Sequence, residues 1–311
     1  MTTLLSLAAV LLLIWFVGAF LLGGNVAPPF PMDAKAAPFW QRFSTGPTPN
    51  AEHAAVVAAL GTVNAKLAAA PRSQHLHILR EHMEGLAGQR VFSAEFRPAL
   101  ANGVAAEWVL APGADPARRI LYIHGGACML GSPRSLRAIT TRFSEVAGAA
   151  VLAIDYRLLP EHTRRDGIED CRSAYQWMLG NGPDGAAAAA AVYVAGDSAG
   201  GNLALSLLAW VRDQGLRAPN AAVALSPATD ATLGSASLRS NVASDAMLGP
   251  LFGRLLKVPR SVLLWGAWWS NRMRPNDPVI SPLMGNLAGL APLLIHASAI
   301  EMLRDDSLRY A

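Results

Sequence analysis

A glycine-flanked serine between a strand-like run and a helix-like run is the feature that most limits how this chain folds. Residues 192–195 form a short apolar run, and Gly196-Asp197-Ser198-Ala199-Gly200 follows directly. Glycines at both second neighbours of the serine permit a sharp strand-to-helix turn that exposes the hydroxyl. The helix predicted over 198–214 directs the positive end of its dipole at this point. The stretch predicts either a nucleophilic serine or, more simply, a serine that caps a helix.

Strand-like and helix-like segments alternate along the chain from residue 90 onward. The pattern predicts strands at 91–96, 104–110, 119–123, 150–154, 192–195, 221–225 and 292–296, and helices at 136–147, 167–179 and 198–214. Continuous apolar strands that alternate with helices are typical of an α/β fold, a mostly parallel sheet covered by helices on both faces. Ligands of such sheets bind at the carboxyl ends of the strands. Both glycine-rich turns, at 125–126 and 196–200, are expected at such ends.

Composition excludes several classes of protein. The 311 residues are 52% hydrophobic and 15% charged, which suits one large α/β domain with an apolar appendage. The net charge of +4 is not gathered into a basic run, so nucleic acid is not an expected partner. The two cysteines, Cys128 and Cys171, form neither a disulfide framework nor a metal motif, and His75 and His77 are expected on a helix surface. No metal or organic cofactor is predicted.

The N-terminus carries an apolar segment. Residues 4–22 are interrupted only by Ser6 and Gly18, and their length suits a membrane-spanning helix. No cationic side chain precedes the segment, and 25–27 offers only a poor cleavage site, so a retained single-pass anchor over 1–27 is favoured over a cleaved secretion signal. Because Lys35 and Arg42 follow the segment, the positive-inside rule favours a cytoplasmic domain.

Two regions beside the predicted sheet are candidates for a lid. Residues 28–89 begin with a proline-rich linker and continue with predicted helices at 51–69 and 73–86. Residues 229–276 form an irregular insertion that includes Trp265, Trp268 and Trp269, for which core packing is the simplest interpretation. Ordinary helix packing is the simpler interpretation of the first region as well.

Acyl transfer by a serine needs a base, an acid that orients the base, and donors for the oxyanion. The turn at Gly125 and Gly126 offers backbone N–H groups with no side chains in the way, and Ala199 offers another directly after Ser198. The chain therefore predicts an oxyanion hole between the two turns.

Four separated blocks of sequence resemble the hormone-sensitive lipase family of α/β-hydrolases. The blocks are His124-Gly125-Gly126-Ala127, Gly131-Ser132, residues 155–162 and residues 196–202. The resemblance implies an α/β-hydrolase domain over 90–311 and an esterase, lipase or deacetylase that acts on small or hydrophobic acyl esters. The N-terminal arrangement is similar to that of arylacetamide deacetylase relatives.

The resemblance also assigns roles to individual residues. It implies Ser198 as the nucleophile, with oxyanion donors at Gly125, Gly126 and Ala199, and Glu301 as the acid in place of the commoner aspartate. Asp305 is the second candidate for the acid. His124 and His162 belong to structural motifs. The chain departs from the family pattern at Cys128 and at 163–166, which affects the expected shape of the acyl pocket.

The catalytic histidine is absent from its expected place. The resemblance puts it one strand beyond Glu301, but no histidine follows His296, which we expect to be packed inside a strand. The chain then lacks its general base and a last strand, and is expected to be inactive as written. A truncated esterase is favoured, because Ser198, the glycine turn and Glu301 all remain; the alternative is a non-catalytic relative that binds hydrophobic ligands. The sequence does not determine the oligomeric state.

Overall fold

The computed structural model of the protein describes residues 2–24, 50–88 and 90–311. Its α-helices are α1 (Thr2–Gly23), α2 (Ala51–Ala69), α3 (His75–Gly85), α4 (Arg137–Ala147), α5 (Arg164–Gly180), α6 (Ser198–Asp213), α7 (Ser237–Ser240), α8 (Leu248–Phe252), α9 (Arg260–Asn271) and α10 (Arg304–Tyr310). The short 3-10 helices are η1 (Arg72–Gln74), η2 (Arg134–Leu136), η3 (Leu255–Lys257) and η4 (Pro282–Met284). The predicted cleavage site at 25–27, the basic residues Lys35 and Arg42, and the linker up to residue 49 lie outside the described residues.

Seven strands form the central sheet in the order β1-β2-β4-β3-β7-β8-β9. They are β1 (Glu95–Ala101), β2 (Val104–Leu110), β3 (Asp115–Ile123), β4 (Ala149–Ile154), β7 (Ala191–Asp197), β8 (Ala221–Leu225) and β9 (Leu293–His296), while β5 (Asn181–Gly182) and β6 (Gly185–Ala186) form a separate short pair. Strands β4, β3, β7, β8 and β9 run parallel to one another, and β1 and β2 are antiparallel at one edge. The predicted mostly parallel sheet is confirmed.

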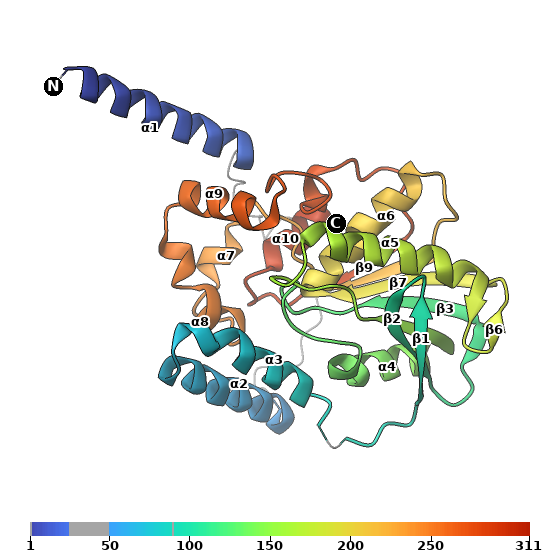
Figure 1. Cartoon of the computed structure of the whole chain (residues 1–311). Coiled ribbons are helices and arrows are strands. Elements are labelled where there is room, and N and C mark those ends of the chain that lie inside the picture. Colours follow the sequence, from blue (N-terminus) through green and yellow to red (C-terminus); the bar gives the residue numbers. More distant parts are fainter. Residues whose placement is uncertain (1, 25–49, 89) are drawn as a thin grey trace, which may run out of the picture.

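Alternating side chains of the strands build a core on each face of the sheet. On one face Leu121 and Leu152 pack with apolar residues of α5 and α6. On the other face Ile120 and Val151 pack around the apolar side of α4. Figure 1 shows α5 and α6 over one face and α4 over the other, as predicted for strands that are apolar throughout.

The register of the parallel strands brings five loops to the same end of the sheet. Ile123 pairs with Ile154 and with Gly196, Gly196 pairs with Ala224, and Leu225 pairs with His296. The segments that follow β3, β4, β7, β8 and β9 therefore emerge together, at the strand ends where sheets of this type bind ligands.

The first strand begins later than predicted. The sequence pattern suggested 91–96, whereas β1 runs from Glu95 to Ala101 and pairs with β2 up to Val104. Asn102 and Gly103 form the tight turn between them, with φ of 52° and 87°. Two positive φ angles match the twist of an antiparallel hairpin, so the turn fixes the register and extends β1 to Ala101.

The N-terminal helix α1 projects away from the sheet and contacts α9 (Figure 1). The ring of Trp265 lies 5.6 Å from that of Trp15 and its Nε1 donates to the Trp15 carbonyl at 3.2 Å. Arg260 donates to the carbonyl oxygens of Gly23 and Gly24 at the end of α1. Trp265 is thus packed, but Trp269 is 63% exposed, so core packing is wrong for Trp269.

The predicted transmembrane anchor over 1–27 is not supported. Within the residues that the structure describes, no helix has both the length and the apolarity required to cross a bilayer.

Candidate active site

Ser198 lies at the turn between β7 and α6 in a backbone conformation that few residues other than glycine adopt. Its φ is 52°. A Cβ atom on Gly200 would overlap the carbonyl oxygens of Ile123 and His124, and one on Gly196 would overlap that of Gly200. The two glycines therefore let the turn press against the end of β3, and the strained serine stands at the start of α6.

The turn after β3 lies directly beside Ser198. We call residues 124–132 the oxyanion loop. The N–H of Gly125 donates to Asp197 Oδ1 at 2.9 Å, and the hydroxyl of Tyr122 donates to the same oxygen at 2.7 Å. The N–H of Gly125, one of the predicted oxyanion donors, thus already has an acceptor in this structure. Burial raises the pKa of Asp197, and the two hydrogen bonds oppose that shift.

Asp197 itself was not predicted to belong to the site. Aspartate in this position usually caps the following helix, but the side chain makes no capping bond to α6. It turns instead toward the oxyanion loop, which the sequence does not reveal because Gly125 lies 72 residues away along the chain.

The next two N–H groups of the loop are free to bind a ligand. Gly126 and Ala127 have φ of 112° and 54°, and within the described part of the chain neither N–H has an acceptor. The N–H groups of Met129 and Leu130 both donate to the carbonyl oxygen of Gly126, at 2.9 Å, which closes the loop into a tight turn. Ala127 is thus a candidate donor that the sequence reasoning missed, although it directly follows the glycine pair.

His124 is buried beneath the loop. Its Nδ1 lies 2.7 Å from the carbonyl oxygen of Gly125, and its ring stacks on Tyr156 with centroids 4.4 Å apart. The Tyr156 hydroxyl donates to the His124 carbonyl at 2.9 Å. Burial lowers the pKa of His124 to about 4, so the ring is neutral near pH 7. These contacts fit a histidine that shapes the loop.

Glu301 lies in the segment after β9, beside the end of β8. Ser226, whose φ is 45°, donates from its hydroxyl to Glu301 Oε2 at 2.8 Å. The other carboxylate oxygen, Oε1, is buried and has no hydrogen-bond partner within the described residues. Burial raises the pKa of Glu301, and the bond from Ser226 opposes that shift. A buried carboxylate oxygen without a partner is uncommon and marks a place for a donor.

Asp305, the second candidate for the acid, holds structural contacts instead. Its carboxylate accepts from the Ser237 N–H at 2.9 Å and from Arg304 Nε at 2.8 Å. The neighbouring Asp306 accepts from the N–H groups of Thr229 and Asp230. Asp305 therefore joins α10 to α7, and Asp306 joins α10 to the loop that follows β8.

The described residues include no hydrogen bond from a histidine to Ser198 or Glu301. His296, which was expected to be packed, is exposed at the end of the edge strand β9. The expectation of a buried His296 is wrong because β9 is the last strand of the sheet, so one of its sides is open.

The departure from the family pattern at Arg164 has a structural counterpart. The Arg164 guanidinium is buried, contacts Cys128 Sγ and donates to Asn202 Oδ1 at 2.6 Å. Burial lowers its pKa to about 10. Asn202 in turn donates to the carbonyl oxygens of Ala228 and Ile280, so this network connects the oxyanion loop, α6 and the segment after β8. Cys128 and Cys171 are free and buried.

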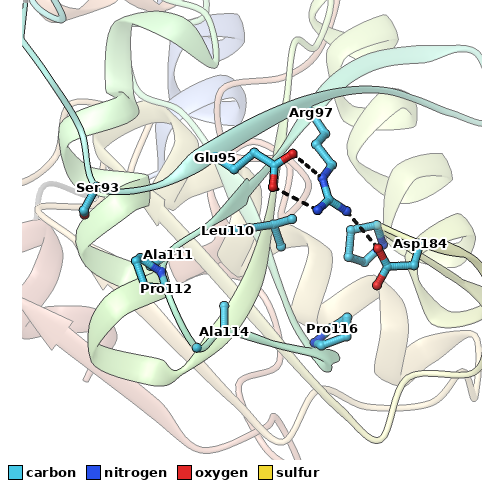
Figure 2. Close-up of a pocket in the computed structure, with 11 residues that line it drawn as sticks. Ser93, Glu95, Arg97, Leu110, Ala111, Pro112, Ala114, Pro116 and Asp184 are labelled. Atoms are coloured by element: carbon cyan, nitrogen blue, oxygen red, sulfur yellow. Dashed lines mark hydrogen bonds and ion pairs between the residues drawn. The ribbon is translucent and has the colours of Figure 1, made fainter.

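A cavity of about 350 Å³ lies beside β1 and β2 and contains none of the predicted site residues. Figure 2 shows Arg97 between Glu95 and Asp184, with nitrogen–oxygen distances of 2.7 and 2.8 Å. Because both carboxylates already pair with the guanidinium, this cavity is not assigned to the chemistry of Ser198.

The chain is similar to known proteins in both sequence and fold. A family model for the alpha/beta hydrolase fold matches residues 120–311. An acetyl-hydrolase of Streptomyces hygroscopicus is 38% identical over 65% of this chain and 63% of the relative. An esterase of Acinetobacter venetianus is 34% identical over 70% of this chain and 68% of its own length. The carboxylesterase/phospholipase LipF of Mycobacterium tuberculosis is 36% identical over 65% of this chain and 53% of its own length.

Solved structures agree with these relatives. The crystal structure of an esterase/lipase from an uncultured bacterium matches with a TM-score of 0.67 and 34% identity over 82% of each chain. An esterase from the bacterial hormone-sensitive lipase family matches with a TM-score of 0.67 and 32% identity over 81% of each chain. The chain spans between 53% and 68% of the length of the three curated relatives.

Proposed function

Because this chain belongs to the alpha/beta hydrolase family and is similar to its bacterial hormone-sensitive lipase members, we propose that it contributes the acyl-serine site of a carboxylic ester hydrolase. The observation that carries the proposal is the strained Ser198, with φ of 52°, on a turn in backbone contact with the oxyanion loop. Strain of this kind is kept where the surrounding structure enforces it, as at a nucleophile.

The proposed reaction begins with attack of Ser198 Oγ on the ester carbonyl carbon, while the hydroxyl proton passes to a base. The carbonyl oxygen becomes an oxyanion, which accepts from the N–H groups of Gly126, Ala127 and Ala199. The dipole of α6 favours the same charge. Loss of one such donor typically costs about 2.7–4 kcal/mol of transition-state stabilisation. The alcohol then leaves with the proton, and water hydrolyses the acyl-serine by the same steps.

Glu301 is the proposed acid. Its unpartnered Oε1 is the natural acceptor for the N–H of a histidine base, while Ser226 holds Oε2 at 2.8 Å. In this arrangement the carboxylate orients the base and stabilises its charged form. Because no histidine in the described part of the chain is hydrogen-bonded to Glu301, turnover without an added base is expected to be slow or absent.

Small or hydrophobic acyl esters are the proposed substrates. The names of the relatives support this class, since one is an acetyl-hydrolase and another a carboxylesterase/phospholipase. The helices α2 and α3 and the insertion at 229–276 are proposed to form a lid over the site. No metal or organic cofactor is needed for the proposed steps.

Hydrolysis of p-nitrophenyl acetate and p-nitrophenyl butyrate tests the proposal, with imidazole added as an external base. We expect turnover that rises with imidazole concentration above the protein-free rate and is abolished by Ser198→Ala. Glu301→Gln is expected to change the imidazole-dependent rate little, because a diffusing base needs no orienting carboxylate. A rate that is equal in wild-type protein and Ser198→Ala would refute the serine mechanism.

A non-catalytic ligand-binding protein is the second candidate function. It is favoured by one observation, that no histidine is hydrogen-bonded to Ser198 or Glu301 in the described part of the chain. It predicts saturable binding of a hydrophobic ester, followed by calorimetry, with no Ser198-dependent turnover even with imidazole.

A further inference from the structure

Arg80, on α3, makes four hydrogen bonds to two loops beside the candidate active site. Its Nε donates to the carbonyl oxygen of Met129 at 2.9 Å, and its Nη2 donates to that of Leu159 at 3.0 Å. The same guanidinium pairs with both carboxylate oxygens of Glu161, at 2.8 and 2.7 Å. One side chain therefore connects the helices before the sheet to the oxyanion loop and to residues 159–161.

A second contact lies one helical turn further along α3. Ser132, in the oxyanion loop, donates from its hydroxyl to Glu84 Oε2 at 2.9 Å. Residues four apart on a helix share a face, so Arg80 and Glu84 present a common surface to the loop. The two loops are also joined to each other, because the N–H of Leu159 donates to the carbonyl oxygen of Cys128 at 2.8 Å.

The bond to Met129 lies close to the proposed oxyanion donors. The Met129 carbonyl accepts from Arg80, while the Met129 N–H donates to the carbonyl oxygen of Gly126 in the same tight turn. A shift of Met129 is therefore transmitted directly to Gly126 and Ala127. We propose that Arg80 is a positioning residue that holds the oxyanion loop in place from α3, an inference that rests on the proposed function of that loop.

The hydrogen bonds from Arg80 to the two carbonyl oxygens are expected to hold the loop more firmly than the ion pair of Arg80 with Glu161 does. The side chains of Arg80 and Glu161 are 32% and 53% exposed, and exposed pairs add little to stability. The contacts to Met129 and Leu159 are partly buried, and they need two nitrogens of one planar guanidinium. Lysine carries the same charge but lacks the planar guanidinium with its several N–H donors, so Arg80→Lys keeps at most some of these hydrogen bonds.

The experiment uses the whole 311-residue chain and four variants. Arg80→Met removes every contact, Arg80→Lys keeps the charge, and Glu161→Gln keeps the carbonyl contacts. Arg72→Met is the matched control, because Arg72 is an exposed arginine next to α3 whose side chain makes no hydrogen bond or ion pair with the described residues. Backbone amide exchange read by mass spectrometry follows the peptides that cover 124–132, and ester hydrolysis with imidazole gives kcat and KM.

We expect Arg80→Met to speed exchange in 124–132 about tenfold, while β7 and α6 keep wild-type rates. We expect kcat to fall by up to about 10²-fold, since small misplacements of catalytic groups cost that much, with KM changed less than about threefold. Glu161→Gln and Arg72→Met are expected to stay within about twofold of wild type, with Arg80→Lys in between.

Unchanged exchange in 124–132 of folded Arg80→Met, or faster exchange confined to α2 and α3, would overturn the inference. If Arg80→Met does not fold, Arg80→Lys takes its place, and wild-type exchange and kcat in that variant would overturn it equally. Absence of hydrolysis in all proteins, wild type included, would contradict the proposed function instead, and the exchange measurement would still decide the role of Arg80.

Discussion

Removal of the Asp197 carboxylate tests how the serine turn is joined to the oxyanion loop. Asp197→Ala leaves two buried donors, the Tyr122 hydroxyl and the Gly125 N–H, without their common acceptor. A buried donor without a partner costs about 1–3 kcal/mol, so two donors give a loss of about 2–6 kcal/mol in the free energy of unfolding. Asp197→Asn keeps an oxygen in place and removes a charge that burial disfavours, so its cost is expected below about 1 kcal/mol.

Urea denaturation followed by tryptophan fluorescence measures both changes, with the slope m checked for each protein. Tyr122→Phe is the companion variant, because it removes only one of the two donors and is expected to cost less than Asp197→Ala. If alanine at 197 were as stable as wild type, or if asparagine were as destabilising as alanine, the reasoning from the shared acceptor would be refuted.

Three further predictions follow from single contacts. Burial raises the pKa of Asp306 to about 7, so the folded protein keeps a proton that the unfolded chain releases above about pH 4. The free energy of unfolding is therefore expected to fall as the pH rises from about 4 to about 7. Urea denaturation at several pH values measures this fall, and Asp306→Asn is expected to make it smaller. Gly200→Ala is expected to destabilise by more than about 3 kcal/mol in the same assay, because its Cβ meets backbone oxygens, whereas Gly61→Ala in open space on α2 is expected to be neutral or to stabilise by up to about 1 kcal/mol. Ser226→Ala removes the hydroxyl that donates to Glu301 Oε2, so the pKa of that carboxyl is expected to rise, as followed by carbon NMR.

The parts of the fold that depend on local pattern were predictable from the sequence. The run before Ser198 is apolar and the run after it has helical periodicity, so β7 and α6 were predicted within two residues of their ends. Asn102 and Gly103 are a local sequence signal for the hairpin after β1, because few residue pairs adopt two positive φ angles.

The contacts within the site were less predictable, because they join residues far apart in the chain. Asp197 was not predicted to belong to the site, and its carboxylate accepts a hydrogen bond from the N–H of Gly125, one of the predicted oxyanion donors. The distance in sequence from Arg80 to Met129 is 49 residues, and neither residue belongs to a recognisable motif. His296 was misjudged for a related reason, since only the strand order shows that β9 lies at the edge.

The nucleophilic role of Ser198 is tested most directly by a fluorophosphonate probe, with the modified residue located by peptide mass spectrometry. The account predicts an adduct on Ser198 that forms faster when imidazole is added as an external base, and no adduct at that peptide in Ser198→Ala. Failure of Ser198 to react at any imidazole concentration, or the same labelling in Ser198→Ala, would contradict it.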